Sequence, residues 1–407
     1  MTLVVQKYGG TSVADPDRIR HVAGRIKRHV AMGERIAVVV SAMAGTTNRL
    51  VGWVNELDPA TFDTAEYDQV VASGEQVTVG LLAIALQSLG VPARSFLGWQ
   101  AGFHTDTAYS KARILDIDPA PVLACLDAGS VAVVAGFQGI SPDNRVTTLG
   151  RGGSDTSAVA LAAALKADRC DIFTDVDGVY TTDPRIVPKA RKIERITYEE
   201  MLEMASLGAK VLQTRSVALA MSHRVRVQVL SSFEDKPGTL VTDEEEIVES
   251  QIVSGIAYSR DEARITLVQV EDRPGMAAAI FGPLAEANIN VDMIVQSVSR
   301  DGKNANLTFT VSRADLPRAL NVLEKARSSL AYDRVLADDN VAKVSVVGVG
   351  MRSHAGIAHK MFATLAAKGI NIQAIATSEI KVSVLIAEDY TELALRALHA
   401  AYGLDGA

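Results

Sequence analysis

The chain has 407 residues, which is more than one ordinary hydrophobic core holds, so two or three domains are expected. With 48% hydrophobic and 22% charged residues, the composition is that of a globular protein rather than a disordered or fibrous one. The net charge is -7, from 41 Lys and Arg against 48 Asp and Glu, and this mildly acidic balance argues against nucleic acid and anionic membranes as partners.

The cysteines and the apolar runs bear on the compartment. Cys125 and Cys170 each lie in an apolar stretch, and their spacing matches no zinc pattern. Two buried thiols favour a reducing cytoplasm over a disulfide scaffold. Met1–Gly10 lacks the basic start and long apolar middle of a signal peptide. The longest apolar runs, such as Ala158–Leu165, are far shorter than the ~20 residues that span a bilayer. A soluble, cytoplasmic protein is expected.

From the start to about Ser231, short β-branched runs alternate with helical patterns. Leu3–Gln6 predicts a strand, and Asp15 predicts the cap of a helix that begins at Pro16 and ends at Gly33. Further strands are expected at Ile36–Val40, Ala93–Leu97, Val131–Phe137, Asp171–Thr174 and Val225–Leu230. Further helices are expected at Glu75–Leu89, Pro119–Ala128 and Ser154–Lys166, and after a capping box formed by Thr197 and Glu200. This alternation predicts an α/β fold with a mostly parallel sheet between helices.

The character of the sequence changes at Phe233–Ser250, where we expect a domain boundary, and an internal repeat follows. Ile265–Val291 and Val344–Ile372 share one plan, which is a strand, a Gly-containing turn, an amphipathic helix, Ile-Asn and a second strand. Five matching pairs are each 81 residues apart: Gly275 and Gly356, Phe281 and Phe362, Leu284 and Leu365, Ile289 and Ile370, Asn290 and Asn371. Each copy is βαββαβ-like and small, which predicts that the two copies pack side by side.

A lysine and two glycines follow the first predicted strand, in the order Lys7-Tyr8-Gly9-Gly10-Thr11-Ser12. A lysine at the carboxyl end of a strand, beside backbone without side chains, can hold phosphate oxygens by charge and by exposed N–H groups. The segment is not a Walker loop, because the lysine precedes the glycines. The alternative is a plain strand-to-helix turn, and spacing alone does not decide between the two.

A second glycine-rich segment, Gly150–Ser157, opens a long apolar helix and contains Arg151. One interpretation is a flexible loop before a well-capped helix, since Ser, Asp and Thr are all good caps. The other is an anion site, because the helix dipole, the free N–H groups and a forked guanidinium all favour negative charge. The anion site is the interpretation that we favour.

The remaining candidate motifs are less informative. Thr174–Arg185 contains an Asp-x-Asp-Gly fragment, but it lacks the third acidic position and the closing Glu of a calcium loop, and a surface hairpin is the alternative. Gly348-Val349-Gly350 resembles a dinucleotide fingerprint, but Ser353 stands where the third glycine belongs, so we reject it. The seven histidines show no ligand spacing.

In combination and in this order, six segments resemble signatures of the amino-acid kinase family, and within it of the kinases that phosphorylate aspartate. They are KYGGTSV, VVSAMAGTTN, SGEQV, TLGRGGSDTSA, FTDVDGVYTTDPR and EEMLEMASLGAKVLQ. The C-terminal repeat is similar to paired ACT domains, which bind free amino acids. The resemblance spans nearly the whole chain. It implies the amino-acid kinase fold followed by two ferredoxin-like ACT domains.

The resemblance also implies roles for individual residues. Lys7 and Asp155 match catalytic residues, Arg151 would hold a substrate carboxylate, and Glu75 would hold the substrate's ammonium group. The implied ATP-binding set is Lys7, Gly9, Gly10, Ser41, Ser154, Thr174, Asp175, Tyr180, Arg185 and Lys210. The implied substrate-binding set is Thr47, Glu75, Arg151, Gly152, Gly153 and Ser154.

The implied reaction transfers the γ-phosphoryl group of ATP to the β-carboxylate of L-aspartate, giving 4-phospho-L-aspartate on the way to lysine, threonine and methionine. A carboxylate nucleophile has a pKa near ~4 and needs no general base, which agrees with the absence of a candidate histidine. Lysines, backbone N–H groups and Mg2+ would neutralise the developing charge. The ATP phosphates would hold the Mg2+, so we name no protein ligand.

For regulation, the resemblance implies feedback inhibition by lysine, threonine or both at the ACT domains. The implied effector contacts are Asp272, Gly275, Asn290, Val291, Asp292 and Gln296 in the first copy, with Asn371 and Ile372 in the second. Turn and cap chemistry alone would also favour Asn and Gly here. The expected domains are a kinase domain over 1–245, a first ACT domain over 264–335, and a discontinuous second one from 250–263 and 340–407. A homo-oligomer, or an α/β-type assembly, is expected through the ACT domains.

Two other functions stay open. One is a kinase for another acidic amino acid, such as glutamate or N-acetylglutamate, which the ACT repeat and the SGEQV segment disfavour. The other is a catalytically inactive amino-acid sensor, which the presence of Lys7, Arg151 and Asp155 disfavours, because a relic could lose them freely.

Overall fold

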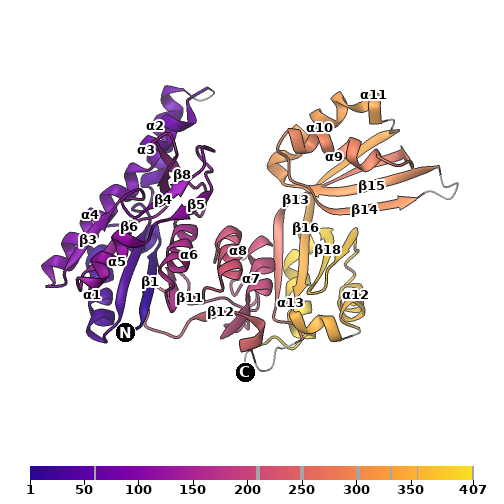
Figure 1. Cartoon of the computed structure of the whole chain (residues 1–407). Coiled ribbons are helices and arrows are strands. Elements are labelled where there is room, and N and C mark those ends of the chain that lie inside the picture. The colour runs from indigo at the N-terminus through magenta and orange to yellow at the C-terminus, as the bar shows by residue number, and fades with distance from the viewer. Residues whose placement is uncertain are drawn as a thin grey trace. The chain divides into compact units, whose positions relative to one another are not determined.

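The computed structural model describes residues 1–58, 61–207, 211–247, 252–298, 303–330, 332–354 and 356–405. They form two compact units that share no sheet (Figure 1). The first unit comprises Met1–Val179, Lys192–Ser206 and Lys210–Val248. The second comprises Tyr180–Arg191, Leu207–Ala209 and Glu249–Ala407.

The first unit is built on an eight-stranded sheet in which every neighbouring pair is parallel except β11 with β12. The strand order is β10 (Arg195–Thr197), β12 (Thr239–Thr242), β11 (Val227–Ser231), β9 (Arg169–Thr174), β1 (Leu3–Tyr8), β2 (Arg35–Val40), β6 (Val131–Ala135) and β3 (Ala93–Phe96). This mostly parallel sheet confirms the predicted α/β class. The long apolar runs became its central strands, because such strands are buried on both faces.

Helices cover both faces of this sheet. Val4 and Tyr8 of β1 pack into a core with Ile19 of α1 (Pro16–Ala31) and Leu82 of α4 (Ser73–Ser88). Because side chains alternate along a strand, Lys7 belongs to the opposite face, against which α6 (Gly153–Leu165) lies. The other helices of the unit are α2 (Thr46–Leu57), α3 (Thr64–Val71), α5 (Ala120–Asp127), α7 (Tyr198–Ser206) and α8 (Thr214–His223), with 3-10 turns η1 (Gly10–Val13) and η2 (Glu244–Glu246).

Two of the predicted helix starts are present in the structure. The Asp15 carboxylate accepts a hydrogen bond from the Arg18 N–H at the start of α1, which confirms the predicted cap. Thr197 and Glu200 bond reciprocally, since each side chain accepts from the other residue's backbone N–H, at 3.1 and 3.2 Å. This is the predicted capping box.

A second, four-stranded sheet in the first unit was not predicted. Its order is β5 (Ile114–Ile117), β4 (Phe103–Thr105), β7 (Gln138–Ile140) and β8 (Val146–Thr148). These strands have three or four residues each, too few for an alternating pattern to stand out in the sequence. Val131–Phe137, predicted as one strand, ends at Ala135, because Gly136 and the positive φ of Phe137 (69°) turn the chain out of the sheet.

Within the described residues, one helical stretch, Thr64–Ser88, is long and apolar enough to cross a membrane, and its apolar window is 50% buried inside the protein. It consists of α3 and α4 and carries the buried carboxylates Asp68 and Glu75. Asp68 accepts hydrogen bonds from the backbone N–H groups of Ser110 and Thr148. The partial burial of Thr64–Ser88 and the hydrogen bonds of its carboxylates are those of helices that pack in the core of a globular unit.

The second unit has one six-stranded antiparallel sheet, which the two copies of the repeat share. Its order is β14 (Asp292–Val298), β15 (Asn304–Val311), β13 (Gly255–Glu271), β16 (Arg334–Val347), β18 (Lys381–Ala387) and β17 (Ala374–Thr377). The helices are α9 (Met276–Glu286), α10 (Leu316–Lys325), α11 (Arg327–Leu330), α12 (Ile357–Ala367) and α13 (Thr391–Ala401), with 3-10 turns η3 (Arg313–Asp315), η4 (Val349–Ser353) and η5 (Glu388–Tyr390).

The repeat is visible in the geometry of its helices. Gly275 and Gly356 precede α9 and α12, and both adopt positive φ angles, 92° and 97°. Leu284 packs in one core and Leu365 in the other. The two copies lie side by side because β13 and β16 are long enough to run through both. The residues from Gly255 to Ser259 pair with the second copy's part of β16, while Ala263–Glu271 pairs with β15 of the first.

A segment from the middle of the chain completes the second core. Residues 180–191, which we name the arm, bury Ile186 and Val187 in the same cluster as Ile256, Val344 and Leu398. The Thr181 carbonyl accepts a hydrogen bond from the Ile256 N–H at 2.7 Å. His399, fully buried in α13, lies 2.9 Å from the Thr181 hydroxyl and 2.9 Å from the Asp405 carboxylate through its two ring nitrogens. The arm is therefore a structural part of the second unit.

Candidate active site

The candidate active site lies where the parallel strands of the first unit end. The carboxyl ends of β1, β2, β6 and β9 meet at one edge, and ligands of such sheets bind outside this edge. Backbone hydrogen bonds tie the loops together there: Ser41 N–H donates to the Tyr8 carbonyl at 3.1 Å, and Gly136 N–H to the Val40 carbonyl at 3.0 Å. The segments that follow these four strands therefore face one region.

Lys7 and Asp155 form an ion pair at this edge. Lys7 is the second-last residue of β1, and Asp155 lies in the first turn of α6, which packs on the same face of the sheet. The Lys7 Nζ and the Asp155 Oδ1 are 2.5 Å apart, and each side chain is 11% exposed. The carboxylate fixes the position of the ammonium group, and the small exposed fraction leaves a little of each open towards solvent.

Glycines keep the space around this ion pair free of side chains. A Cβ on Gly9 would lie 3.4 Å from the Lys7 Nζ, and one on Gly10 would lie 2.9 Å from the Ala42 carbonyl oxygen. At Gly136 a Cβ would lie 2.9 Å from the Ser154 side chain at the start of α6. Backbone without side chains beside a cation and a helix N-terminus is suited to phosphate oxygens.

Glu75 contributes a buried carboxylate next to the loop after β2. Its Oε1 accepts a hydrogen bond from the Ala42 N–H at 2.9 Å, while its Oε2 is buried without a hydrogen-bond partner among the described residues. Burial raises the pKa of Glu75 to about 7, against the lowering effect of the Ala42 N–H bond. A buried carboxylate oxygen without a donor is suited to a cationic group of a ligand.

The glycine before Glu75 and the next helix fix this arrangement. A Cβ on Gly74 would lie 2.7 Å from the Ala42 Cβ, so α4 can approach the loop only with glycine there. Gly45, with a φ of 77°, caps α2, and Thr47 lies in the first turn of that helix. Ala42 contacts both Gly10 and Glu75, so the lysine loop and the buried carboxylate lie on either side of one short segment.

The structure places the other predicted site residues as follows. Gly152, with a φ of 72°, caps α6, Gly153 and Ser154 are its first residues, and Arg151 is exposed just before it. Thr174 ends β9 and donates a hydrogen bond to the exposed Asp175 at 3.1 Å. Tyr180 and Arg185 lie on the arm, where Arg185 pairs with Asp183 and lowers the pKa of that carboxyl. Lys210 lies outside the described residues.

Sequence reasoning missed three residues that shape the site: Ala42, Gly74 and Gly136. Gly136 could have been noticed as a glycine near the end of a predicted strand, where glycine often marks a close approach of another segment. That segment is the start of α6, where Ser154 occupies the space that a Cβ on Gly136 would fill. Ala42 and Gly74 lie inside the signatures VVSAMAGTTN and SGEQV, but their contacts with Glu75 and with each other do not follow from the sequence, because they depend on how α4 packs against the loop.

The structure offers no ready protein site for a metal ion in the part that it describes. Within those residues, no three His, Cys, Asp or Glu side chains gather in a way that could hold one. Near Lys7, Asp155 is engaged in its ion pair, and Asp175 is exposed. The oxygen donors at this edge would fit a metal ion only together with ligands that a substrate brings.

The first copy of the repeat holds a cavity of about 340 Å³ at the N-terminus of α9. The predicted effector residues Asp272, Gly275 and Gln296 line it, and the Gln296 amide donates to the Asp272 carboxylate at 3.2 Å. Ile280 and Leu307 supply an apolar wall. Acid and amide groups, a helix N-terminus and an apolar wall suit a free amino acid.

The remaining predicted effector residues are not part of the described lining of this cavity. Asp292 is paired with Lys343, with 2.8 Å between Oδ2 and Nζ, and this pairing helps to lower the pKa of the carboxyl. Val291 packs against the first core, and Asn290 is exposed beside it. In the second copy, Ile372 packs against the second core and Asn371 is exposed. The structure therefore gathers three of the eight predicted residues into one cavity.

Comparisons with known proteins agree with this architecture. Residues 2–231 match the amino acid kinase family, and residues 264–328 and 344–402 each match an ACT domain. The chain is 56% identical over 407 residues to an aspartokinase of Pseudomonas aeruginosa, covering 100% of this chain and 98% of that one. An aspartate kinase of Pseudomonas putida is 55% identical over 406 residues, again with 100% and 98% covered.

A solved structure agrees as well. The crystal structure of E. coli aspartokinase III in complex with aspartate and ADP has a TM-score of 0.81 and 29% identity, covering 98% of this chain and 99% of that chain. The chain therefore has a first unit with a lysine–aspartate pair at the carboxyl edge of its sheet, followed by two ACT domains. It belongs to the amino acid kinase family and, within it, to the aspartokinases.

Proposed function

We propose that Lys7, Asp155 and Glu75 form the centre at which this enzyme transfers the γ-phosphoryl group of ATP to the β-carboxylate of L-aspartate. The observation that carries the proposal is the juxtaposition of two sites around Ala42. On one side, Lys7 and the glycines offer positive charge and open backbone to phosphates. On the other, Glu75 offers an unpartnered oxygen to an ammonium group.

The proposed mechanism is alignment and charge neutralisation. The β-carboxylate of aspartate is already ionised at neutral pH, so it can attack without losing a proton. Lys7, held by Asp155, would stabilise the negative charge on the transferred group, together with the N–H groups at the start of α6. Arg151, exposed before α6, would hold a carboxylate of the substrate. Ser41, Thr47 and Ser154 would supply hydroxyl contacts.

ATP is proposed to extend from the Lys7 loop towards Thr174, the last residue of β9, and Asp175 after it. Tyr180, Arg185 and Lys210 stay predictions from the family resemblance, since Tyr180 and Arg185 belong to the second unit and Lys210 lies outside the described residues. Magnesium would enter with the nucleotide and offset phosphate charge, since Mg2+ commonly binds through substrate phosphates and one or two carboxylates. Asp155, paired with Lys7, and Asp175, which follows the last residue of β9, are the acidic residues proposed to face the phosphates.

The hydroxamate assay tests the activity. Purified protein with ATP, magnesium and L-aspartate is expected to form an acyl phosphate that hydroxylamine traps as aspartyl hydroxamate. L-glutamate and N-acetylglutamate should give at most a small fraction of that product, because a site built for one carboxylate spacing misaligns the next homologue. Product from either of these substrates but none from aspartate would contradict the assignment.

For regulation, we propose that the cavity at α9 binds lysine or threonine. In support, the crystal structure of E. coli aspartokinase III in complex with lysine and aspartate has 29% identity to this chain and a TM-score of 0.74. The effector carboxylate would lie at the N-terminus of α9 beside Gly275, and its ammonium group beside Asp272 and Gln296. Inhibition then arises from unequal binding to two conformations of the enzyme.

An isosteric substitution tests this cavity. Asp272→Asn is expected to raise the lysine or threonine concentration for half-inhibition by about tenfold, because an uncharged amide binds ammonium more weakly. The uninhibited rate should stay unchanged. Glu286→Gln is the matched control, since Glu286 is exposed at the other end of the same helix. The measurement titrates lysine and threonine, each alone and both together. If the wild type and Asp272→Asn are inhibited equally, the cavity is not the effector site.

We further propose that the second unit joins chains into an oligomer. β14 and β17 end the strand order of the sheet but contact each other, and they expose Ile294, Val298 and Ile375 by 51, 55 and 43%. Exposed apolar side chains on a sheet edge invite pairing with another chain.

A cytoplasmic location is proposed as well, because Cys125 and Cys170 are buried, free thiols.

A further inference from the structure

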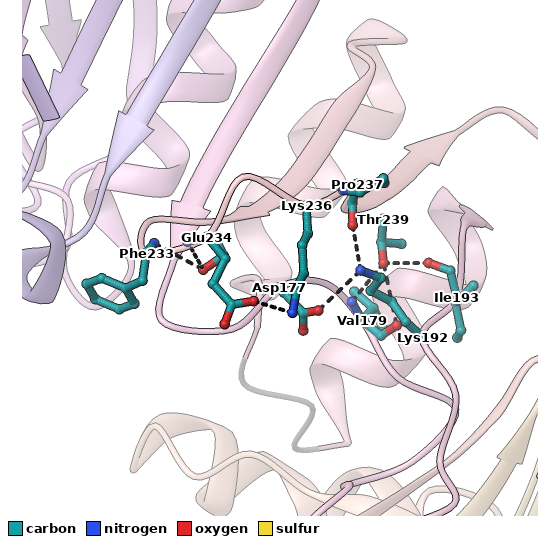
Figure 2. A network of polar contacts seen from close by, with 10 residues as sticks. Asp177, Val179, Lys192, Ile193, Phe233, Glu234, Lys236, Pro237 and Thr239 are labelled. Carbon is teal, nitrogen blue, oxygen red and sulfur yellow. Dashed lines mark hydrogen bonds and ion pairs between the residues drawn. The ribbon is translucent and has the colours of Figure 1, made fainter. Parts of the chain in front are cut away.

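The loop that follows β9 is anchored at its far end by a polar cluster (Figure 2). We name it the base cluster: Asp177, Val179, Lys192, Ile193, Pro237 and Thr239, all in the first unit. It closes the two ends of the arm, since the Ile193 N–H donates to the Val179 carbonyl at 2.8 Å. None of these residues is among the predicted site residues.

Lys192 joins two loops within this cluster. Its Nζ lies 3.2 Å from the Asp177 carboxylate and donates to the Pro237 carbonyl at 2.5 Å. The Lys192 side chain is 23% exposed and that of Asp177 24%. One ammonium group therefore ties the loop after β9 to the loop between β11 and β12.

Thr239 and Gly178 make the anchor tight. The buried Thr239 hydroxyl accepts from the Val179 N–H at 2.8 Å and donates to the Ile193 carbonyl at 2.6 Å. A Cβ on Gly178 would lie 2.7 Å from the Thr239 hydroxyl and 2.8 Å from the Lys192 Cδ. The aliphatic stem of Lys192 therefore packs directly against the backbone of the loop, while its ammonium group holds the loop's carboxylate.

The near end of the same loop is also fixed. The Thr174 carbonyl accepts a hydrogen bond from the Ser232 N–H at 2.8 Å, and Thr174 is the last residue of β9. Only Asp175, Val176 and Asp177 separate this point from Gly178, and the four steps from Thr174 to Gly178 span at most ~14 Å of extended chain. Hydrogen bonds therefore hold both ends of the short segment that carries Asp175.

We propose that Lys192 is a positioning residue for ATP: by binding both the Asp177 carboxylate and the Pro237 carbonyl, it sets the loop from Asp175 to Gly178 in the conformation that contacts the nucleotide. This inference rests on the proposed placement of ATP at Thr174 and Asp175. Lys192 itself does not touch the reacting atoms. Its loss leaves phosphoryl transfer intact once the nucleotide is bound and weakens the binding of the nucleotide.

The test compares three variants of the full chain. Lys192→Met keeps the aliphatic packing against Gly178 and removes both polar contacts, so KM for ATP and the Kd for ADP by calorimetry are expected to rise about tenfold. The kcat and the KM for aspartate should change less than about twofold. Lys192→Arg, which can still reach the carboxylate, should recover most of the affinity. Lys236→Met is the matched control, because Lys236 in the same cluster region is 61% exposed and pairs with Glu234.

Asp175→Ala separates the inference from the proposed function. If Asp175→Ala weakens ADP binding and Lys192→Met does not, the role of Lys192 is wrong while the nucleotide site stands. If neither variant changes the Kd for ADP, the loop does not bind the nucleotide, and the positioning role of Lys192 is wrong as well. The same conclusion holds if Lys192→Met raises the Kd for ADP and Asp175→Ala does not. If Lys236→Met lowers the affinity for ADP as much as Lys192→Met does, the effect comes from the loss of any nearby positive charge. That result would also overturn the positioning role of Lys192. Should Lys192→Met fail to fold, Asp177→Asn removes the same ion pair from the other side and is expected to weaken ADP binding likewise.

Discussion

Lys7→Met is expected to lower kcat by about a thousandfold while the KM for aspartate changes little. The ammonium group is desolvated, with the Lys7 side chain only 11% exposed, so its charge acts on phosphate oxygens with little screening by water. Lys7→Arg should recover only part of the rate, because the larger, planar guanidinium does not fit the point-charge position beside Asp155.

The measurement needs a control for folding, since Lys7→Met leaves Asp155 without its cation. The double variant Lys7→Met with Asp155→Asn removes both charges and should melt near the wild-type temperature, with kcat as low as in the single variant. Lys27→Ala, an exposed lysine on α1, should leave kcat unchanged. A folded Lys7→Met enzyme with near-normal kcat would exclude the proposed role.

Glu75→Gln is expected to raise the KM for aspartate by about a hundredfold. The amide keeps the oxygen that accepts from the Ala42 N–H, but it places an N–H₂ group where the buried Oε2 would meet the substrate's ammonium group. The kcat at saturating aspartate should fall much less, because Glu75 is proposed to bind and not to react. An unchanged KM would show that the ammonium group binds elsewhere.

The raised pKa of Glu75 gives this prediction a pH dependence. Only the ionised carboxylate pairs well with ammonium, so the wild-type KM for aspartate should fall as the pH rises through about 7. In Glu75→Gln this dependence should disappear. Steady-state KM values at several pH values between 5.5 and 8.5 measure both, with Glu66→Gln, an exposed acid on α3, as the control.

Ionisation of Glu75 should favour aspartate binding but lower the stability of the fold. The folded pKa of about 7 lies above the usual 4.5, so the folded state binds the proton more tightly than the unfolded state does. The free energy of unfolding therefore falls as the pH rises from 4.5 to 7, by an amount on the order of 3 kcal/mol. Above pH 7 Glu75→Gln should melt at a higher temperature than the wild type, and below pH 4.5 the two should converge.

The sequence predicted the parts of the fold that depend on long, regular patterns. The central strands, helix α1 with its Asp15 cap and the capping box at Thr197 follow from residues close together in the chain, and the two-copy repeat follows from matching residues 81 positions apart. The strands of the four-stranded sheet were missed, because three or four residues give too little periodicity.

The candidate site was predictable only in part. Strand order and alternation bring Lys7 onto the face where α6 presents Asp155, and the resemblance to a family named both residues. The unpartnered oxygen of Glu75 depends on burial, and the bond from Lys192 to the Pro237 carbonyl depends on contacts between distant loops. Ile186 and Val187 look like ordinary loop residues in the sequence, and only the structure shows that they complete the second core.

That core also constrains how the protein can be made on the ribosome. Ile186 and Val187 emerge roughly 200 residues before Leu395, Leu398 and Leu404, which belong to the same core cluster. At ~5–20 residues per second, the cluster that buries these apolar side chains stays incomplete for at least ~10 s. Translation speed and chaperone access during that interval should therefore affect the yield of native enzyme more than they would for a chain whose units mature one after the other.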